Sequence, residues 1–389
     1  MSFGAIISAS RSSSDSTGTL RGNLHFAGQT LVEYQARQAS LAGASEILIR
    51  VSSVTPGLSQ AVDRLSADGI KVSLIRDMIT LVRDAPRDRD MLLIGDGVLA
   101  AQSYLDALGQ IDGNALLVSD DSRASAPFER IDAGQRWGGL ARVTPDLLFG
   151  TLDMIGEWDL ELTLVRAAVQ ANARRITAPQ DDLLEGRVAL IDGQQHADLV
   201  GQGVVARQPR AGTRTGGAEY YLLDPLAGLL APVLMRTQVP AMQIRVAAMV
   251  AAAIGLVPIE LGWPGVGLLL MVVALLLGLV ADRLDELALR ARSDGWVALV
   301  APALALVGIG LVGDALPAFY LVLLLGLIMV ADRWRRVTGT RPWMIFTPAS
   351  AVILMLGAVL LGSIGQGLTL AMLCAIGSAG AIILRRLPE

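Results

Sequence analysis

Residues 262–281 read GWPGVGLLLMVVALLLGLVA and carry no charged side chain. A helix needs about 20 apolar residues to cross the hydrocarbon core of a bilayer. This run therefore predicts a transmembrane helix. Four more uncharged runs follow the same pattern, and so does one run with a single charge at Arg245. Six such runs in succession argue against the alternative that they are buried helices of a soluble core. They span residues 239–259, 295–313, 315–331, 343–364 and 367–384.

Loop charges predict the orientation of these six spans. Arginines follow the second, fourth and sixth runs, whereas the opposite loops carry only Glu260 or Asp314. Positive loops stay on the cytoplasmic side, so we expect a multi-pass protein of the inner membrane with both termini in the cytoplasm. The first ten residues lack a basic region and a long apolar core, so we expect no cleaved signal peptide. The arginines are Arg283, Arg290, Arg292, Arg333, Arg335, Arg336, Arg341, Arg385 and Arg386.

The composition limits the kinds of site that the 389 residues can form. Hydrophobic residues make up 53% and charged residues 17%, which excludes a disordered chain. One Cys excludes a disulfide framework, and two His leave little for a His-built metal site. With 32 basic against 36 acidic residues the net charge is −4, so we expect no nucleic-acid partner.

Residues 1–218 alternate apolar runs with helical patterns. This alternation predicts a Rossmann-like α/β domain in the cytoplasm, with a parallel sheet covered by helices on both faces. Ligands of such sheets lie beyond the carboxyl ends of the strands. We therefore expect the Ser-rich loop 10–19 and Asp96 near one rim. The strands are expected at 3–9, 46–51, 70–75, 91–94 and 115–118, and the helices at 29–42, 58–67 and 98–108.

This domain resembles the nucleotidyltransferases of the sugar-phosphate and polyol-phosphate type. Residues 26–51, FAGQTLVEYQARQASLAGASEILIRV, are similar to the stretch that follows their phosphate loop. Residues 90–100, DMLLIGDGVLA, resemble the strand that ends in a metal-binding Asp, here Asp96. Residues 128–148 are similar to the part that returns to the sheet. The resemblance implies that Asp96 binds a metal ion.

The phosphate loop of that family is glycine-rich and contains a Lys. Here the loop reads RSSSDSTGTLRGN at residues 11–23, with two Gly and no Lys. Arg11 and Arg21 are the cations that would bind phosphate or nucleotide in its place. An Arg is a planar fork and a Lys a point charge, so the exchange changes the binding geometry. The alternative is a solvated Ser-rich turn beside an ordinary strand-end Asp.

One group of charges in the membrane half has the spacing of a binding site. Asp282 and Asp285 end the second run and share a face if the helix continues. Two carboxylates at a membrane interface can hold a divalent cation, which in turn binds phosphates. Arg290 is the candidate phosphate ligand beside them. The alternative is a polar loop between two spans.

The layout resembles the CDP-alcohol phosphotransferase family. That family has six spans, a juxtamembrane amphipathic helix, here residues 219–237, and a motif D-x-x-D-G-x-x-A-R at the end of the second span. The resemblance implies a magnesium or manganese site at Asp282 and Asp285. Glu286 replaces the motif Gly and is a candidate extra carboxylate, while the third and fourth motif Asp fall near Ala303 and Val307.

The two halves in this order resemble the fusion of an inositol-1-phosphate cytidylyltransferase with a di-inositol-phosphate-phosphate synthase. The implied domains are residues 1–218, the helix 219–237 and the membrane domain 238–389. The implied protein is a homodimer in the lipid bilayer that takes a CDP-alcohol, or CTP and a phospho-polyol, in phospholipid head-group metabolism.

Three functions stay open. One is a divergent transferase of this kind, and the second is a pseudoenzyme that binds nucleotide, lipid or a partner without turnover. The third is a transporter or channel, which charges paired across several spans would favour.

Overall fold

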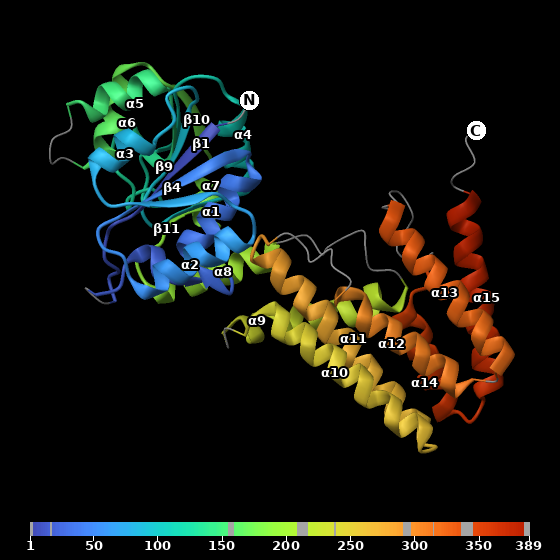
Figure 1. Cartoon of the computed structure of the whole chain (residues 1–389). Coiled ribbons are helices and arrows are strands. Elements are labelled where there is room, and N and C mark those ends of the chain that lie inside the picture. The colour runs from blue at the N-terminus through green and yellow to red at the C-terminus, as the bar shows by residue number, and fades with distance from the viewer. Residues whose placement is uncertain are drawn as a thin grey trace. The chain divides into compact units, whose positions relative to one another are not determined.

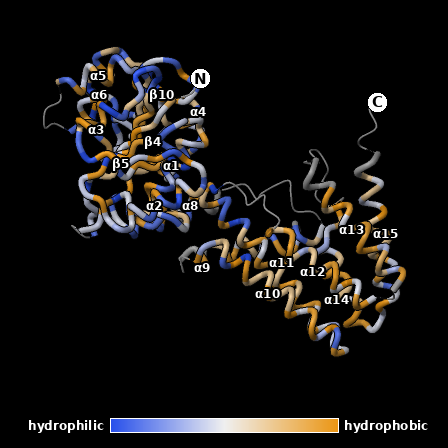
Figure 2. Tube along the Cα trace, viewed as in Figure 1, coloured by the Kyte–Doolittle hydropathy of each residue, from blue (hydrophilic) through white to orange (hydrophobic). Residues whose placement is uncertain are grey.

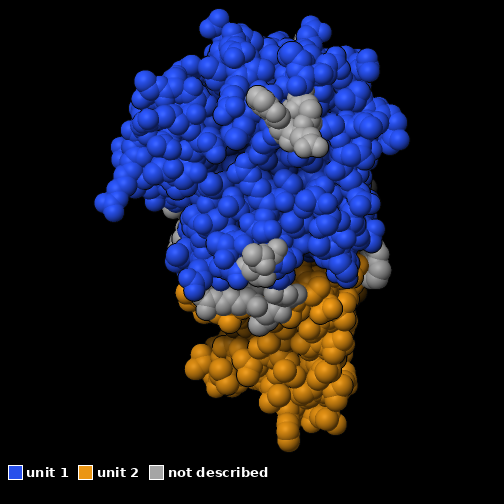
Figure 3. All heavy atoms as spheres, turned by 90° about the vertical axis from the view of Figure 1, so that its left-hand side faces the viewer, with its two compact units in different colours: residues 1–207, 288–290 blue, residues 208–287, 291–389 orange. Residues whose placement is uncertain are grey.

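The computed structural model describes residues 3–15, 18–154, 159–207, 217–236, 239–290, 297–313, 315–335 and 345–384. Two compact units make up the chain, residues 1–207 with 288–290, and residues 208–287 with 291–389 (Figure 3). We call them the α/β unit and the helical unit. The predicted loop residues Arg292, Asp314, Arg336, Arg341, Arg385 and Arg386 lie outside the described residues.

The α/β unit contains a seven-stranded, mostly parallel sheet (Figure 1). Its order is β10-β8-β9-β6-β1-β4-β5. β1 pairs in parallel with β4 and β6, β4 with β5, and β8 with β10. The strands are β1 (Phe3–Ala9), β4 (Ala44–Val51), β5 (Val72–Ile75), β6 (Met91–Ile94), β8 (Ala115–Asp120), β9 (Gln135–Val143) and β10 (Arg174–Ala178).

β9 departs from the predicted parallel sheet. It lies between β6 and β8 and runs antiparallel to both. The connection from β8 to β9 contains no helix, and a parallel pair needs a long crossover, usually through a helix. The expectation of a wholly parallel sheet is therefore wrong at this strand.

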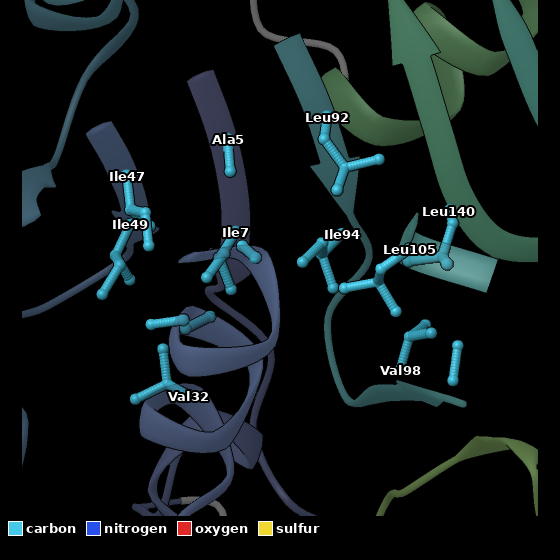
Figure 4. Close-up of a cluster of buried hydrophobic side chains, with 14 of the residues drawn as sticks. Ala5, Ile7, Val32, Ile47, Ile49, Leu92, Ile94, Val98, Leu105 and Leu140 are labelled. Carbon is cyan, nitrogen blue, oxygen red and sulfur yellow. The ribbon is translucent and has the colours of Figure 1, made fainter. Parts of the chain in front are cut away.

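Helices cover both faces of the sheet, as predicted. Successive β1 residues point to opposite faces, so Ala5 and Ile7 belong to one buried cluster and Ile6 to the other. Figure 4 shows the first cluster, in which Val32 packs below Ile7. This cluster takes side chains from α1 (Leu31–Leu41), α2 (Pro56–Ala67) and α4 (Gln102–Gln110). The second takes them from α3 (Met78–Asp84), α5 (Pro145–Leu152) and α6 (Leu160–Gln170).

The predicted helix over residues 98–108 is wrong at its start. Residues 98–100 form β7 (Val98–Ala100), which pairs antiparallel with β11 (Val188–Leu190). The amides of Gln35 and Gln38 donate hydrogen bonds to the carbonyls of Val98 and Ala100, which favours this extended backbone. The smaller elements are η1 (Arg21–Asn23), β2 (His25–Phe26), β3 (Gln29–Thr30), α7 (Gln180–Leu184) and α8 (Gln194–Arg207).

In the helical unit each of the six predicted apolar runs contains one helix (Figure 2). Three of them are long and apolar enough to cross a membrane, over residues 241–260, 264–287 and 364–381. The others are shorter apolar helices, so the described residues hold three candidate spans and not six. The helices are η2 (Glu219–Leu223), α9 (Asp224–Arg236), α10 (Ala241–Glu260), α11 (Pro264–Leu287), α12 (Val297–Val312), α13 (Ala315–Arg335), α14 (Pro348–Leu360) and α15 (Ile364–Leu384).

α10 and α11 form a closely packed hairpin. A tight turn at Gly262, which has a φ of +82°, joins them. A Cβ at Gly267 would overlap the carbonyl oxygen of Gly255 and the Ile259 side chain, so only glycine permits this approach. Small residues allow helices to pack this closely in membranes. The hairpin brings the start of α10 beside the end of α11.

A substitution at Gly139 in β9 would test how closely the sheet packs against β7. Gly139 has a φ of +86°, and a Cβ there would overlap the Val98 side chain. We expect Gly139→Ala to lower the free energy of unfolding by about 2–4 kcal/mol, because strain and overlap add. Gly150→Ala in α5 is the control, since no atom lies within 4 Å of its Cβ position. Thermal unfolding in detergent measures both variants, and equal melting temperatures would contradict the prediction.

Candidate functional site

Asp96 lies at the carboxyl edge of the sheet, as predicted. It follows β6, and its Oδ2 accepts hydrogen bonds from the backbone N–H groups of Ser10 and Arg11, each at 2.6 Å. These two residues follow β1, the neighbouring strand. Backbone N–H groups at such a loop are the donors that commonly bind phosphate. In this protein the carboxylate of Asp96 already occupies them.

A second carboxylate, Glu161, lies beside Asp96. The backbone N–H of Asp96 donates to Glu161 Oε2 at 3.3 Å. Burial, and the nearby charge of Asp96, raise the pKa of Glu161 to about 7. Burial also raises the pKa of Asp96, although the N–H groups of Arg11 and Ser10 act against it. Sequence reasoning missed Glu161; the available signal was a carboxylate on the apolar face of α6.

Arg11, the first predicted phosphate ligand, has a partner inside the α/β unit. Its Nη2 donates to Asp159 Oδ2 at 2.9 Å. Although partial burial of Asp159 opposes the effect, the hydrogen bond and charge of Arg11 hold the pKa of that carboxyl below its ordinary value. The guanidinium of Arg21 donates to the carbonyl of Ser12 at 3.3 Å. Phosphate binding by Arg11 and Arg21 stays a prediction.

The Ser-rich loop is tied to the start of α8. The hydroxyls of Ser13 and Ser14 donate to the carbonyl of Asp192, each at 3.1 Å. Asp15 Oδ2 accepts from the backbone N–H of Gln194 at 2.5 Å. The N-terminus of a helix is a ready anion site, and here a carboxylate of the loop fills it.

In the helical unit, Arg245 bridges the two predicted carboxylates. Its Nη2 lies 2.6 Å from Asp282 Oδ1 and its Nη1 lies 2.6 Å from Asp285 Oδ2. The side chains of Arg245 and Asp285 are 6% and 7% exposed, and that of Asp282 is 43% exposed. The predicted shared face of Asp282 and Asp285 is confirmed. Arg245, the single charge of the run 239–259, is thus paired within the helical unit.

A second ion pair lies on another face of α11. Arg283 donates to Asp224 Oδ1 from Nε at 3.0 Å and from Nη2 at 2.6 Å. Its Nη1 lies 3.5 Å from Glu286 Oε2. Glu286 is thus placed beside Arg283, and its role as an extra carboxylate stays a prediction. Arg290 lies beyond the end of α11, in the short segment grouped with the α/β unit.

As arranged, Asp282 and Asp285 do not fit a divalent cation. A metal ion needs free carboxylate oxygens from several ligands, and the guanidinium of Arg245 already pairs with both acids. Within the described ranges, no three His, Cys, Asp or Glu side chains gather as a metal site would require. Ala303 and Val307 are exposed on the outer side of α12.

Comparison with known proteins assigns no family. No family model matches the chain, and no curated protein matches it. The candidate sites of the chain are therefore the two clusters around Asp96 and Arg245.

The raised pKa of Glu161 predicts a pH dependence of stability. Between about pH 4.5 and 7 the unfolded chain releases this proton while the folded chain keeps it, so stability falls as the pH rises through this window. The loss is on the order of 3 kcal/mol. We expect the melting temperature of the Glu161→Gln variant to change less with pH over the same range. An unchanged pH profile in that variant would contradict the assignment.

The Arg245 bridge predicts unequal effects of its two acids. Arg245→Leu leaves Asp285 buried without its cation and should cost about 3–5 kcal/mol of unfolding free energy. Asp282→Asn should cost less than Asp285→Asn, because Asp282 is partly exposed. The double variant Arg245→Leu/Asp285→Leu should recover most of the loss. Denaturant unfolding in detergent micelles measures all four, and additive losses in the double variant would contradict this coupling.

Proposed function

We propose that this chain is a membrane-anchored relative of the fused nucleotidyltransferase and CDP-alcohol phosphotransferase proteins that binds a ligand or partner without turnover. Its ligand would be a nucleotide, a lipid or another protein. The finer layout belongs to the same proposal: six spans, both termini in the cytoplasm, and a homodimer. The described α/β unit and the three candidate spans support the coarse layout.

The observation that carries the proposal is the position of the Arg245 guanidinium. It pairs at 2.6 Å with each of the two acids that would hold the metal of a CDP-alcohol. A tethered cation at this point neutralises the carboxylates without any bound ion. A metal could enter only by displacing a buried guanidinium, and breaking a buried ion pair is costly.

The absence of a general base from the described residues of α12 supports the same proposal. Transfer to an alcohol requires a group within hydrogen-bond reach to take the hydroxyl proton. α12 packs against α11, and its residues 297–312 contain no ionisable side chain. The positions that match the third and fourth motif acids are occupied by Ala303 and Val307.

A divergent transferase is the second candidate, and one observation favours it. Asp282 and Asp285 converge on a single point instead of separating into solvent. If Arg245 moved away, the two carboxylates would be placed to share a cation. The same assay decides between the two candidates.

The test is release of CMP from a CDP-alcohol by the full chain in detergent, with MgCl₂ and a phospho-polyol whose hydroxyl accepts the transferred phosphoalcohol. We expect CDP-inositol to give CMP no faster than a protein-free control, and Asp282→Asn and Asp285→Asn to leave that rate unchanged. Glu260→Gln, an exposed acid at the other end of α10, is the matched control. Release that Asp282→Asn abolishes and Glu260→Gln leaves intact would establish the transferase and reject the proposal.

A further inference from the structure

Three polar atoms at the carboxyl edge of β1 and β6 have no hydrogen-bond partner within the described part of the chain. They are Ser8 Oγ, Asp96 Oδ1 and Glu161 Oε1. Their residues are 1%, 2% and 3% exposed. The Ser8 hydroxyl lies next to the Glu161 carboxyl, and Glu161 also contacts the backbone of Asp96. The three atoms therefore form one buried cluster.

The chemistry of this cluster defines the group that would complete it. When they are ionised, the carboxyl groups of Asp96 and Glu161 accept hydrogen bonds and carry negative charge, and a hydroxyl accepts as well as donates. An unpaired buried polar atom is costly, so the cluster is complementary to a donor with positive charge. A primary ammonium has three N–H donors, one for each of the three acceptors.

A divalent cation matches these atoms less well than an ammonium. The other oxygen of Asp96 is already bound by the N–H groups of Ser10 and Arg11. Among the residues that the structure describes, no three His, Cys, Asp or Glu side chains gather here as a metal site would require. Magnesium demands a nearly octahedral set of oxygens, whereas an ammonium needs three acceptors.

Arg11 gives the cluster a second recognition element. Its guanidinium is close enough for its charge to act on both Glu161 and Asp96. It is paired with Asp159 in a part-buried ion pair, which an anionic group of a ligand can replace. Arg11 thus stands where it can receive the anionic end of a small zwitterion.

We propose that this edge of the sheet binds a small zwitterion, with its primary ammonium on Ser8 Oγ, Asp96 Oδ1 and Glu161 Oε1 and its anionic group on Arg11. The proposal goes beyond the function above, because it concerns the α/β unit alone. It holds or fails whether or not the helical unit transfers a phosphoalcohol.

The probe is 2-aminoethyl phosphate, titrated calorimetrically into the full chain in detergent micelles. We expect saturable binding, weakened at least about tenfold in Glu161→Gln and about fivefold in Ser8→Ala, since charged hydrogen bonds are lost. Arg11→Gln should weaken binding as well, through the phosphate. Glu129→Gln, an exposed acid of the same unit, should bind like the natural chain.

Two related probes separate the ammonium from the phosphate. 2-Hydroxyethyl phosphate lacks the ammonium, and phosphocholine carries a quaternary nitrogen with no N–H donor, so both should bind at least about tenfold more weakly. Equal binding of either probe would overturn the proposal. So would the absence of saturable binding, retention of full affinity in both Glu161→Gln and Ser8→Ala, or displacement of the amine by MgCl₂ alone.

Discussion

The ion pair of Arg245 with Asp285 is the constraint on which the helical unit depends. A buried charge in an apolar bundle is tolerated only with a partner, so these two residues must face each other. That requirement sets the register of α10 against α11, and the glycines at 255 and 267 allow the close approach. Arg283 and Asp224 add a second buried pair that joins α9 to α11. Two ion pairs thus fix three helices.

The elements of both units could be predicted where periodicity and burial agree. β1, β4 and β6 are apolar on both faces because helices cover both, and that pattern is visible in the sequence. The direction of β9 was not visible, since it depends on a helix-free connection rather than on strand composition. Each predicted apolar run contains a helix, but only three of these helices are long and apolar enough in their described residues to cross a membrane. Several helices are shorter than their runs, as at Thr347, where a side-chain cap begins α14 within its run.

The candidate sites could be predicted only where the contacts are local. The spacing of Asp282 and Asp285 predicts a shared helix face, because positions three apart lie together. Their cation comes from another helix, and Glu161 reaches Asp96 from 65 positions along the chain. Such contacts depend on tertiary packing. A lone charge in an apolar run and a carboxylate on an apolar helix face were nevertheless signals that both residues have a buried partner.

The two clusters differ in how completely the chain satisfies them. Where no ligand binds, buried charges must find internal partners, because unpaired buried charges are costly. Arg245 meets this need for both acids in the helical unit. In the α/β unit, Asp96 is satisfied at one oxygen by backbone N–H groups, while its other oxygen, Glu161 and Ser8 retain unpaired atoms among the described residues. A cluster whose charged groups are all paired within the chain does not require a ligand. A cluster with unpaired acceptor atoms still requires a hydrogen-bond donor. The unpaired atoms therefore favour ligand binding at Asp96 over ligand binding at Asp282.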